Sequence, residues 1–366
     1  MNMNKRISTI IIQLVIAVII FEVVLRIIYF QKNANDTFAF ISTYKSLSFR
    51  ATDVYSDQLL KYHNLVRPDS AHVNKDIVKE VIESNSFEYT PWVDFKMIDY
   101  SGKYINTKNF IRKSIPDKFI NAARPNPLKV YLFGGSTMFG FNVTDKETIP
   151  SALAEIYASK CKNCPSLELY NYGILSYYSY NELMLFTQLL FTNSKPDVVI
   201  FLDGLNDFFI TQAAKRRIPW YYYRLKENVR NEKDSTASLF PLEKNETTDQ
   251  AVKDIADKYL SNIEQARKLC RTYEITPLFF IQPNPYFNYP NKANDPLVTR
   301  SSNQLIENGY RFIEKQCDST KNMYFLGNML QTEKDLPFID EFHYSPAMNK
   351  RIAAEIYERL VPALDK

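Results

Sequence analysis

Residues 128–140 read LKVYLFGGSTMFG and join a short, mostly apolar segment to a tight turn. An apolar run of this length that ends at glycine is typical of a strand buried within a sheet. The paired glycines, Gly134 and Gly135, let the chain turn sharply and expose the hydroxyl of Ser136. The chain has only 8 Gly in 366 residues, so two together indicate a backbone requirement. The stretch therefore predicts a serine on a turn at the end of a strand.

Strand and helix patterns alternate outward from this stretch. Strands are predicted at residues 128–133, 167–172, 197–202, 275–281 and 323–326, and helices at residues 148–160, 180–191, 249–271, 301–315 and 346–360. Apolar strands separated by helices favour an α/β fold, with a parallel sheet covered by helices on both faces. In such sheets, sites form at the carboxyl ends of the strands. Ser136, Gly173 and Asn206 each follow a predicted strand, so the pattern brings them to one edge.

The overall composition is that of an ordinary globular protein, with 45% hydrophobic and 23% charged residues. The formal net charge is +4, and Lys and Arg are scattered among Asp and Glu. This pattern argues against a nucleic-acid partner, which requires a basic patch or stripe.

Four cysteines are compatible with an oxidising compartment. Cys161 and Cys164 have no second pair and no histidine pair nearby, which argues against a zinc site. Cys270 and Cys317 each end a predicted helix just before a strand. We hypothesise two structural disulfides, Cys161–Cys164 and Cys270–Cys317, although four cysteines allow three pairings.

The N-terminal residues 8–30 are almost wholly apolar. A helix needs about 20 such residues to cross a bilayer. Lys5 and Arg6 precede the segment, as expected for a cytoplasmic end. No small-residue cleavage site follows it, which favours an uncleaved anchor over a signal peptide. We therefore expect a single-pass membrane protein whose main domain lies outside the cytoplasm.

The chain is expected to have three regions. Residues 1–30 form the cytoplasmic tip and the transmembrane anchor, and residues 31–125 form a mixed, membrane-proximal region that packs on the main domain. Residues 126–366 form the main domain, with an insertion at about 208–247. The insertion contains the aromatic stretch 220–223. Asn35, Asn142 and Asn245 lie in Asn-x-Thr sequons.

An acid and a histidine near the C-terminus complete a possible hydrolytic site with Ser136. A serine becomes a good nucleophile only when a base accepts its proton. His343 is a suitable base, and Asp340, three residues earlier, is placed to orient it. The chain has only 3 His; His63 and His72 lie in the irregular early region, and we assign them no role.

The same site needs donors for a developing oxyanion. The backbone N–H groups of Ser136 and Gly173 and the side chain of Asn206 are the candidates. Each element also has a purely structural alternative: a turn serine, a glycine at a strand end, a helix N-cap and a loop pair that caps the last helix. A phosphate-binding loop would need Lys after Gly140, where Phe141 stands.

Together, residues 133–137, Gly173, residues 204–207 and residues 340–343 resemble the SGNH hydrolase superfamily, also called GDSL-like hydrolases. Its hallmark positions correspond to Ser136, Gly173, Asn206 and His343, with Asp340 as the acid. The resemblance covers about residues 128–362 and implies a flavodoxin-like three-layer α/β/α sandwich. It implies no metal and no organic cofactor.

One departure from the family pattern is visible at Gly135, which stands where the founding motif has Asp. The Gly-Gly-Ser-Thr variant resembles membrane-anchored branches of the superfamily. Activities in the superfamily include esterases, lipases, sugar O-deacetylases and O-acetyltransferases. We therefore expect a membrane-anchored serine esterase or O-acyltransferase that acts on an acylated envelope glycan, with acetyl as the expected group. A lipid-acting esterase and a non-catalytic glycan-binding component of an envelope polysaccharide assembly are the alternatives.

Overall fold

The computed structural model describes residues 53–90, 92–161, 163–192, 195–209, 247–298 and 303–364. All of them belong to one compact unit, formed by residues 48–223 and 235–366. The predicted anchor at 8–30, the aromatic stretch 220–223 and the sequons at Asn35 and Asn245 lie outside the described residues. Among the helices that are described, none combines the length and the apolar character needed to cross a membrane.

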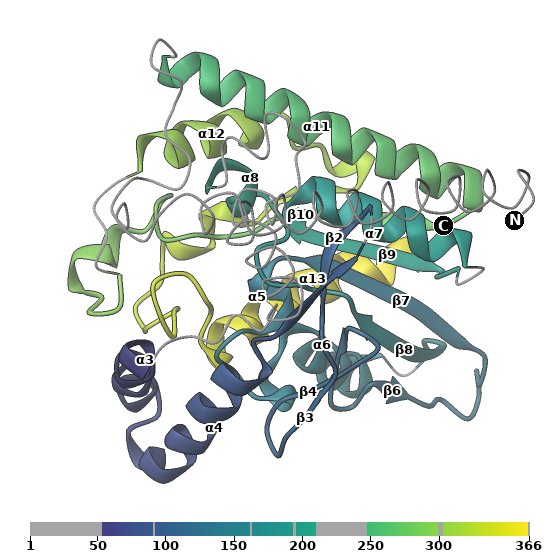
Figure 1. Cartoon of the computed structure of the whole chain (residues 1–366). Coiled ribbons are helices and arrows are strands. Elements are labelled where there is room, and N and C mark those ends of the chain that lie inside the picture. Colours follow the sequence, from purple (N-terminus) through teal and green to yellow (C-terminus); the bar gives the residue numbers. More distant parts are fainter. Residues whose placement is uncertain are drawn as a thin grey trace, which may run out of the picture. The chain divides into compact units, whose positions relative to one another are not determined.

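The centre of the described unit is a sheet whose main strands are parallel (Figure 1). They are β7 (Pro127–Gly134), β8 (Ser166–Asn171), β9 (Val198–Asp203), β10 (Thr276–Ile281) and β11 (Met323–Phe325), in the spatial order β11-β10-β9-β7-β8. Each of the neighbouring pairs in this order is parallel. The predicted α/β fold with a mostly parallel sheet is therefore confirmed.

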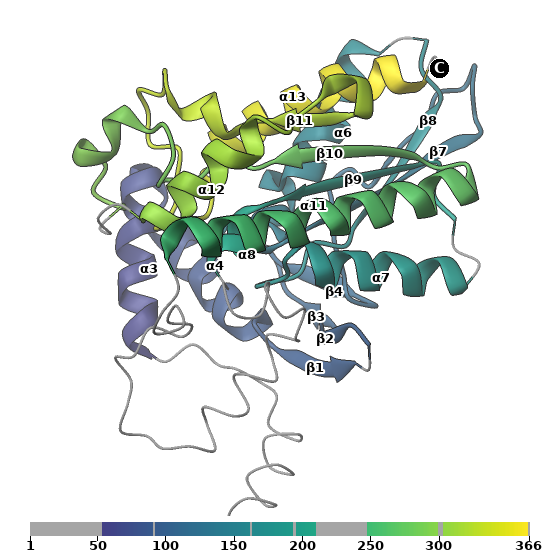
Figure 2. The ribbon, with the colours of Figure 1, turned by 90° about the horizontal axis from the view of Figure 1, so that it is seen from above.

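Alternate residues of the strands face two separate cores. On β7, Tyr131 and Phe133 pack with α7 (Ser179–Phe191) and α11 (Thr248–Tyr273). Val130 and Leu132 pack on the other face with α6 (Ile149–Lys160) and α13 (Pro346–Leu364). Figure 2 shows these helix pairs on opposite sides of the sheet. Because successive strand side chains point to opposite faces, one apolar strand serves both cores.

Short antiparallel strands extend the sheet beyond β8. They are β3 (Tyr100–Ser101), β4 (Asn106–Lys108), β5 (Ile111–Arg112) and β6 (Lys118–Phe119). Both β5 and β6 pair with β8, at Arg112 opposite Asn171 and at Lys118 opposite Glu168. Strands on both sides of residue 125 thus belong to one sheet. Two- and three-residue strands carry no periodicity, so the sequence pattern does not indicate them.

The remaining elements surround this framework. They are helices α3 (Asp53–Val66), α4 (Ala71–Ser84), α5 (Ser136–Phe139), α8 (Leu205–Phe209) and α12 (Gln304–Glu314), the hairpin β1 (Phe87–Thr90) and β2 (Asp94–Met97), and the 3-10 helices η1 (Pro68–Ser70), η2 (Asp145–Glu147), η3 (Pro290–Asn294), η4 (Ser319–Lys321) and η5 (Gly327–Leu330). The predicted helices and strands of the main domain are all present, with ends displaced by a few residues.

The cysteines differ from the hypothesis in one of the two pairs. Cys161 and Cys164 are bonded, as predicted. The predicted Cys270–Cys317 disulfide is wrong, because both are free thiols. Burial raises the pKa of each of these thiols to about 12. The sequence shows that each cysteine ends a helix, but it does not show the direction of the side chain. A disulfide also requires two side chains that point toward each other.

Candidate active site

Ser136 is the first residue of α5, directly beyond the end of β7. Its Oγ lies 2.8 Å from Nε2 of His343. The His343 Nδ1 lies 2.7 Å from Oδ2 of Asp340. A carboxylate accepts only, so Nδ1 carries the hydrogen and Nε2 is free to accept from the Ser136 hydroxyl. The structure therefore joins the three predicted residues into one hydrogen-bonded chain.

Asp340 is held in an orientation that suits this chain. Its Oδ1 accepts hydrogen bonds from the backbone N–H groups of Phe342 and His343, both at 2.8 Å. Asp340 is only 4% exposed. Burial alone would raise the pKa of Asp340, but the charge and hydrogen bond of His343, and then the two backbone amides, hold it below its usual value. Asp340 is thus ionised at neutral pH although it is buried.

Close packing explains the glycine at position 135. A Cβ there would lie 2.6 Å from Nδ2 of Asn206 and 3.1 Å from the carbonyl oxygen of Tyr177. The φ of Gly135 is −78°, which other residues also adopt. Gly135 is therefore required for space rather than for backbone freedom. A side chain at this position would displace Asn206.

Asn206 lies in the first turn of α8, beyond the end of β9. Its Nδ2 donates to the carbonyl oxygen of Tyr177 at 2.6 Å. A side-chain amide carries two hydrogens, so one remains for a bound group. This bond fixes the amide beside Gly135, which precedes Ser136.

The amide of Gly173 has a hydrogen-bond partner within its own turn. The Gly173 N–H donates to Oδ1 of Asn171 at 2.9 Å. A Cβ on Gly173 would lie 2.3 Å from the backbone nitrogen of Phe139 and 2.7 Å from the carbonyl carbon of Met138. Gly173 therefore lets β8 end close against the backbone of α5. Its predicted role as an oxyanion donor has no support in this geometry.

Ser176, two residues after Ile174, carries a backbone donor on the turn that leads to Tyr177. In the turn from Ile174 to Tyr177, the Tyr177 N–H donates to the Ile174 carbonyl at 3.1 Å. Ser176 has φ +63°, a conformation that normally selects glycine. Its N–H has no hydrogen-bond partner within the part of the chain that is described. The Tyr177 carbonyl that follows Ser176 accepts from Asn206, so this turn lies next to a candidate oxyanion donor. No motif in the sequence indicates that contact.

A turn after α5 closes around the acid and the histidine. Phe141 packs on the imidazole of His343, with ring centroids 4.7 Å apart. Asn142 donates from Nδ2 to Oδ2 of Asp340. The Asn142 side chain is fully buried, so its sequon is inaccessible to a glycan in the folded chain. In the sequence, Asn142 stands out only as part of a sequon, and no pattern there indicates this contact.

A family model described as GDSL-like lipase/acylhydrolase matches residues 130–356. The chain belongs to this family. It is a serine hydrolase that acts on ester bonds, as the resemblance implied. No curated protein is similar to the chain at a significant level.

Several solved structures are similar to this GDSL-like hydrolase. A lipolytic protein of the G-D-S-L family from Desulfitobacterium hafniense DCB-2 is 14% identical, with 63% of this chain and 99% of that one covered and a TM-score of 0.38. A carbohydrate acetylesterase family member from Sinorhizobium meliloti is 16% identical, with coverage of 65% and 99% and a TM-score of 0.37. The esterase EstA from Pseudoalteromonas sp. is 14% identical, with coverage of 65% and 100% and a TM-score of 0.35. Similarity this distant says nothing about the substrate.

Three buried carboxyl groups lie close to Asn206 in the GDSL-like domain. Asp207 accepts from the hydroxyl of Ser179 at 2.6 Å, and Asp203 accepts from the hydroxyl of Tyr259 at 2.6 Å. Burial and the charge of Asp203 raise the pKa of Asp207 to about 8. Burial raises the pKa of Asp203 to about 6, and burial with both neighbouring charges raises the pKa of Glu182 well above its usual value. The cluster therefore retains protons at neutral pH.

This cluster predicts a loss of stability on the alkaline side. The folded chain holds protons that the unfolded chain, whose carboxyl groups titrate near pH 4, has already released. The stabilisation of the folded chain by these bound protons is complete below about pH 4 and is lost as pH rises toward about 8. Each such proton changes the free energy of unfolding by about 1.4 kcal/mol per pH unit. Melting temperatures between pH 6 and pH 8.5, measured by scanning fluorimetry, are expected to fall.

Asp203→Asn provides the matched comparison. The amide still accepts from Tyr259 and removes the charge that raises the pKa of both Glu182 and Asp207. The melting temperature of this variant is expected to fall less steeply with pH than that of the wild type. Equal slopes for the two proteins would contradict the assignment.

Proposed function

We propose that this chain is a membrane-anchored, extracytoplasmic serine esterase or O-acyltransferase that acts on an acylated, and specifically an acetylated, envelope glycan. One observation carries the catalytic part of the proposal. The Ser136 hydroxyl, the His343 imidazole and the Asp340 carboxylate form a continuous hydrogen-bonded chain, with contacts of 2.8 and 2.7 Å. This is the arrangement that acyl transfer through a serine requires.

In the first step, Ser136 attacks the ester carbonyl while His343 accepts its proton at Nε2. Asp340 holds the tautomer with hydrogen on Nδ1 and stabilises the imidazolium that forms. His343 then returns the proton to the departing alcohol. The tetrahedral oxyanion is bound by the Ser136 N–H, the remaining Asn206 hydrogen and the Ser176 N–H. Gly173 supports the backbone of α5 in this scheme.

The second step decides between hydrolysis and transfer. Water attacking the acyl-Ser136 carbonyl releases a carboxylic acid, whereas a sugar hydroxyl takes over the acyl group. Both routes use His343 as the base and share the same acyl-enzyme. The residues described here are therefore compatible with both outcomes.

The location and the glycan substrate are supported by the sequence. Residues 8–30 are long and apolar enough for an anchor, and Lys5 and Arg6 precede them on the expected cytoplasmic side. An anchored enzyme outside the cytoplasm meets the polymers of the envelope. The aromatic stretch 220–223 offers ring surfaces of the kind that sugars contact.

An acyl-chain series tests the proposed function. The full-length chain, purified in detergent, is assayed with p-nitrophenyl acetate, butyrate and octanoate and with an acetylated oligosaccharide. Cleavage that favours acetyl esters and removes acetyl groups from the oligosaccharide supports a glycan substrate. A preference for octanoate identifies a lipid-acting esterase instead. Transfer of labelled acetyl to an added oligosaccharide acceptor, in excess of acetate release, identifies an acyltransferase.

A wild-type chain that is folded and inert toward every ester contradicts the catalytic proposal. The alternative of a non-catalytic glycan-binding component then stands. The joint presence of Ser136, Asn206, Asp340 and His343 argues against it, because a binding role needs no nucleophile, base and acid in hydrogen-bond contact.

A further inference from the structure

The acid of the proposed triad has a second side-chain partner. Oδ2 of Asp340 accepts from Nδ1 of His343 and also from Nδ2 of Asn142. Asn142 is fully buried and has φ +67°, in the left-handed region that asparagine tolerates better than most residues. Its Oδ1 has no hydrogen-bond partner among the described residues. Asn142 thus holds Asp340 with one end of its amide and carries an unsatisfied acceptor at the other.

A buried histidine on α3 carries the complementary unsatisfied donor. His63 is fully buried, and Nη1 of Arg67 lies 3.0 Å from its Nδ1. An arginine only donates, so Nδ1 accepts and the hydrogen of the neutral ring is on Nε2. Nε2 has no partner in the part of the chain that is described.

The ring of His63 is neutral at physiological pH. Burial and then the charge of Arg67 lower the pKa of His63 to about 3. The Nε2–H of His63 is therefore a neutral donor that does not titrate near neutral pH.

An ion pair ties α3 to the segment that contains Asn142. Nη2 of Arg67 lies 2.6 Å from Oε2 of Glu147. The same oxygen accepts from the backbone N–H and the hydroxyl of Thr144, each at 2.9 Å. Nδ2 of Asn74 donates to the carbonyl oxygen of Arg67 at 2.9 Å, which fixes the arginine backbone. The side chain of Arg67 thus links His63 to a residue only two positions from Asn142.

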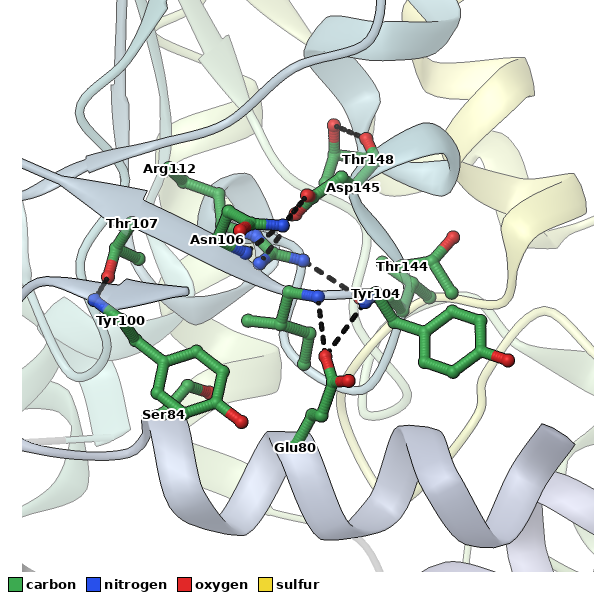
Figure 3. A network of polar contacts seen from close by, with 12 residues as sticks. Glu80, Ser84, Tyr100, Tyr104, Asn106, Thr107, Arg112, Thr144, Asp145 and Thr148 are labelled. Atoms are coloured by element: carbon green, nitrogen blue, oxygen red, sulfur yellow. Dashed lines mark hydrogen bonds and ion pairs between the residues drawn. The ribbon is translucent and has the colours of Figure 1, made fainter. Parts of the chain in front are cut away.

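The other side of this segment is held by a second polar network (Figure 3). Asp145 forms a buried ion pair with Arg112 at 2.8 Å and accepts from Nδ2 of Asn106 at 2.7 Å. The Asp145 N–H donates to the carbonyl oxygen of Tyr104 at 2.8 Å. Glu80 of α4 in turn accepts from the N–H of Tyr104 at 2.8 Å. Residues before position 125 therefore hold the Asn142 segment from two directions.

We propose that His63 and Asn142 are positioning residues for the triad. The Nε2–H of His63 and Oδ1 of Asn142 are joined through one bound water, and the Nδ2–H of Asn142 then holds Asp340 at the angle that His343 requires. This inference rests on the proposed function of Ser136, His343 and Asp340. It makes α3 part of the active-site support rather than a spacer that precedes the catalytic domain.

Asn142 completes the set of donors to Asp340. Nδ1 of His343 and Nδ2 of Asn142 contact Oδ2, and the backbone N–H groups of Phe342 and His343 donate to Oδ1. The Asn142 donor offsets part of the negative charge of the buried carboxylate. Without it, Oδ2 loses the side-chain contact that holds it toward His343.

Three variants of the full-length chain test the proposal. His63→Leu removes the donor, His63→Gln retains an N–H at similar reach, and Asn142→Gly removes the amide while tolerating the left-handed backbone. With p-nitrophenyl acetate, His63→Leu and Asn142→Gly are each expected to lower kcat about 10-fold at unchanged KM. His63→Gln is expected to restore most of the activity. His72→Leu, at an exposed position on α4, is the matched control and is expected to leave kcat unchanged.

A double-mutant cycle shows whether the two residues act through one contact. His63→Leu combined with Asn142→Gly is expected to be no slower than Asn142→Gly alone. Additive losses in the double variant would overturn the proposal. Equal activity of His63→Leu and His63→Gln would overturn it as well. Glutamine retains an N–H donor and leucine does not, so equal activity would mean that the donor has no role.

A spectroscopic arm separates this inference from the proposed function. The downfield proton resonance of the His343 Nδ1–H, assigned by its loss in His343→Gln, reports the bond to Asp340 without any substrate. Broadening or a shift of this resonance in His63→Leu and Asn142→Gly supports positioning even if the wild type turns over no ester. A resonance that is unchanged in both variants would overturn the proposal even if the wild type is an active esterase.

Discussion

Ser136→Ala is expected to lower kcat for p-nitrophenyl acetate by at least about 10³-fold, because the Ser136 hydroxyl is the group that forms the acyl-enzyme. The hydroxyl is the only part of the side chain that contacts Nε2 of His343. Alanine removes the nucleophile and leaves the turn unchanged, so the melting temperature should stay near that of the wild type. Steady-state kinetics and labelling of the protein by a fluorophosphonate probe measure the effect.

The control for this experiment is Ser159→Ala on the solvent-facing side of α6. Its hydroxyl donates to the carbonyl oxygen of Ile156, and the residue is exposed. The variant is expected to retain full turnover and full labelling. Turnover by Ser136→Ala at a rate within 10-fold of the wild type would exclude Ser136 as the nucleophile, since residual catalysis without one is far weaker.

Asn206→Ala is expected to lower kcat by about 10²-fold to 10³-fold with a smaller change in KM. The loss of a donor that is aimed at a developing oxyanion has this magnitude, because the interaction is stronger in the transition state than in the ground state. The bond from Asn206 to the Tyr177 carbonyl fixes the direction of the amide in the free enzyme. Initial rates over a range of substrate concentrations separate kcat from KM.

Asn294→Ala is the matched control for the loss of a side-chain amide. Asn294 is exposed on η3, and its Nδ2 donates to Oδ1 of Asn291 at 2.9 Å, away from the residues assigned to the site. Full turnover is therefore expected. A higher KM with an unchanged kcat in Asn206→Ala would mean that the amide binds the ground state. This result would contradict the assignment of Asn206 to the oxyanion.

The pattern of the sequence was sufficient for the main architecture. The apolar runs that became β7, β9 and β10 are long enough, and buried enough on both faces, to specify a parallel sheet. Their carboxyl ends fall at one edge by geometry alone, so Ser136 and Asn206 were expected to be near one another. The spacing of Asp340 and His343 anticipated their contact, because a tight loop brings residues three apart within hydrogen-bond reach.

The sequence pattern did not indicate how closely backbone segments approach each other in the folded chain. Gly173 follows a strand just as Asn206 does, but its N–H is used by Asn171 and its missing side chain makes room for α5. The short strands β3 to β6 join the sheet through single pairs of residues such as Arg112 and Asn171. Neither the direction of an N–H nor a two-residue pairing leaves a periodic signal.

By itself, the sequence determined that this protein has an α/β sheet with a serine, an asparagine and an acid–histidine pair beyond the ends of its strands. Local chain geometry and hydrophobic periodicity are enough for that. Only the tertiary structure decided that Asn142 donates to Asp340 and that His63 on α3 is linked, through Arg67 and Glu147, to the segment that follows Asn142. Such contacts depend on how α3 packs against the turn that follows α5. That packing determines which side chains are buried and where their hydrogen bonds point.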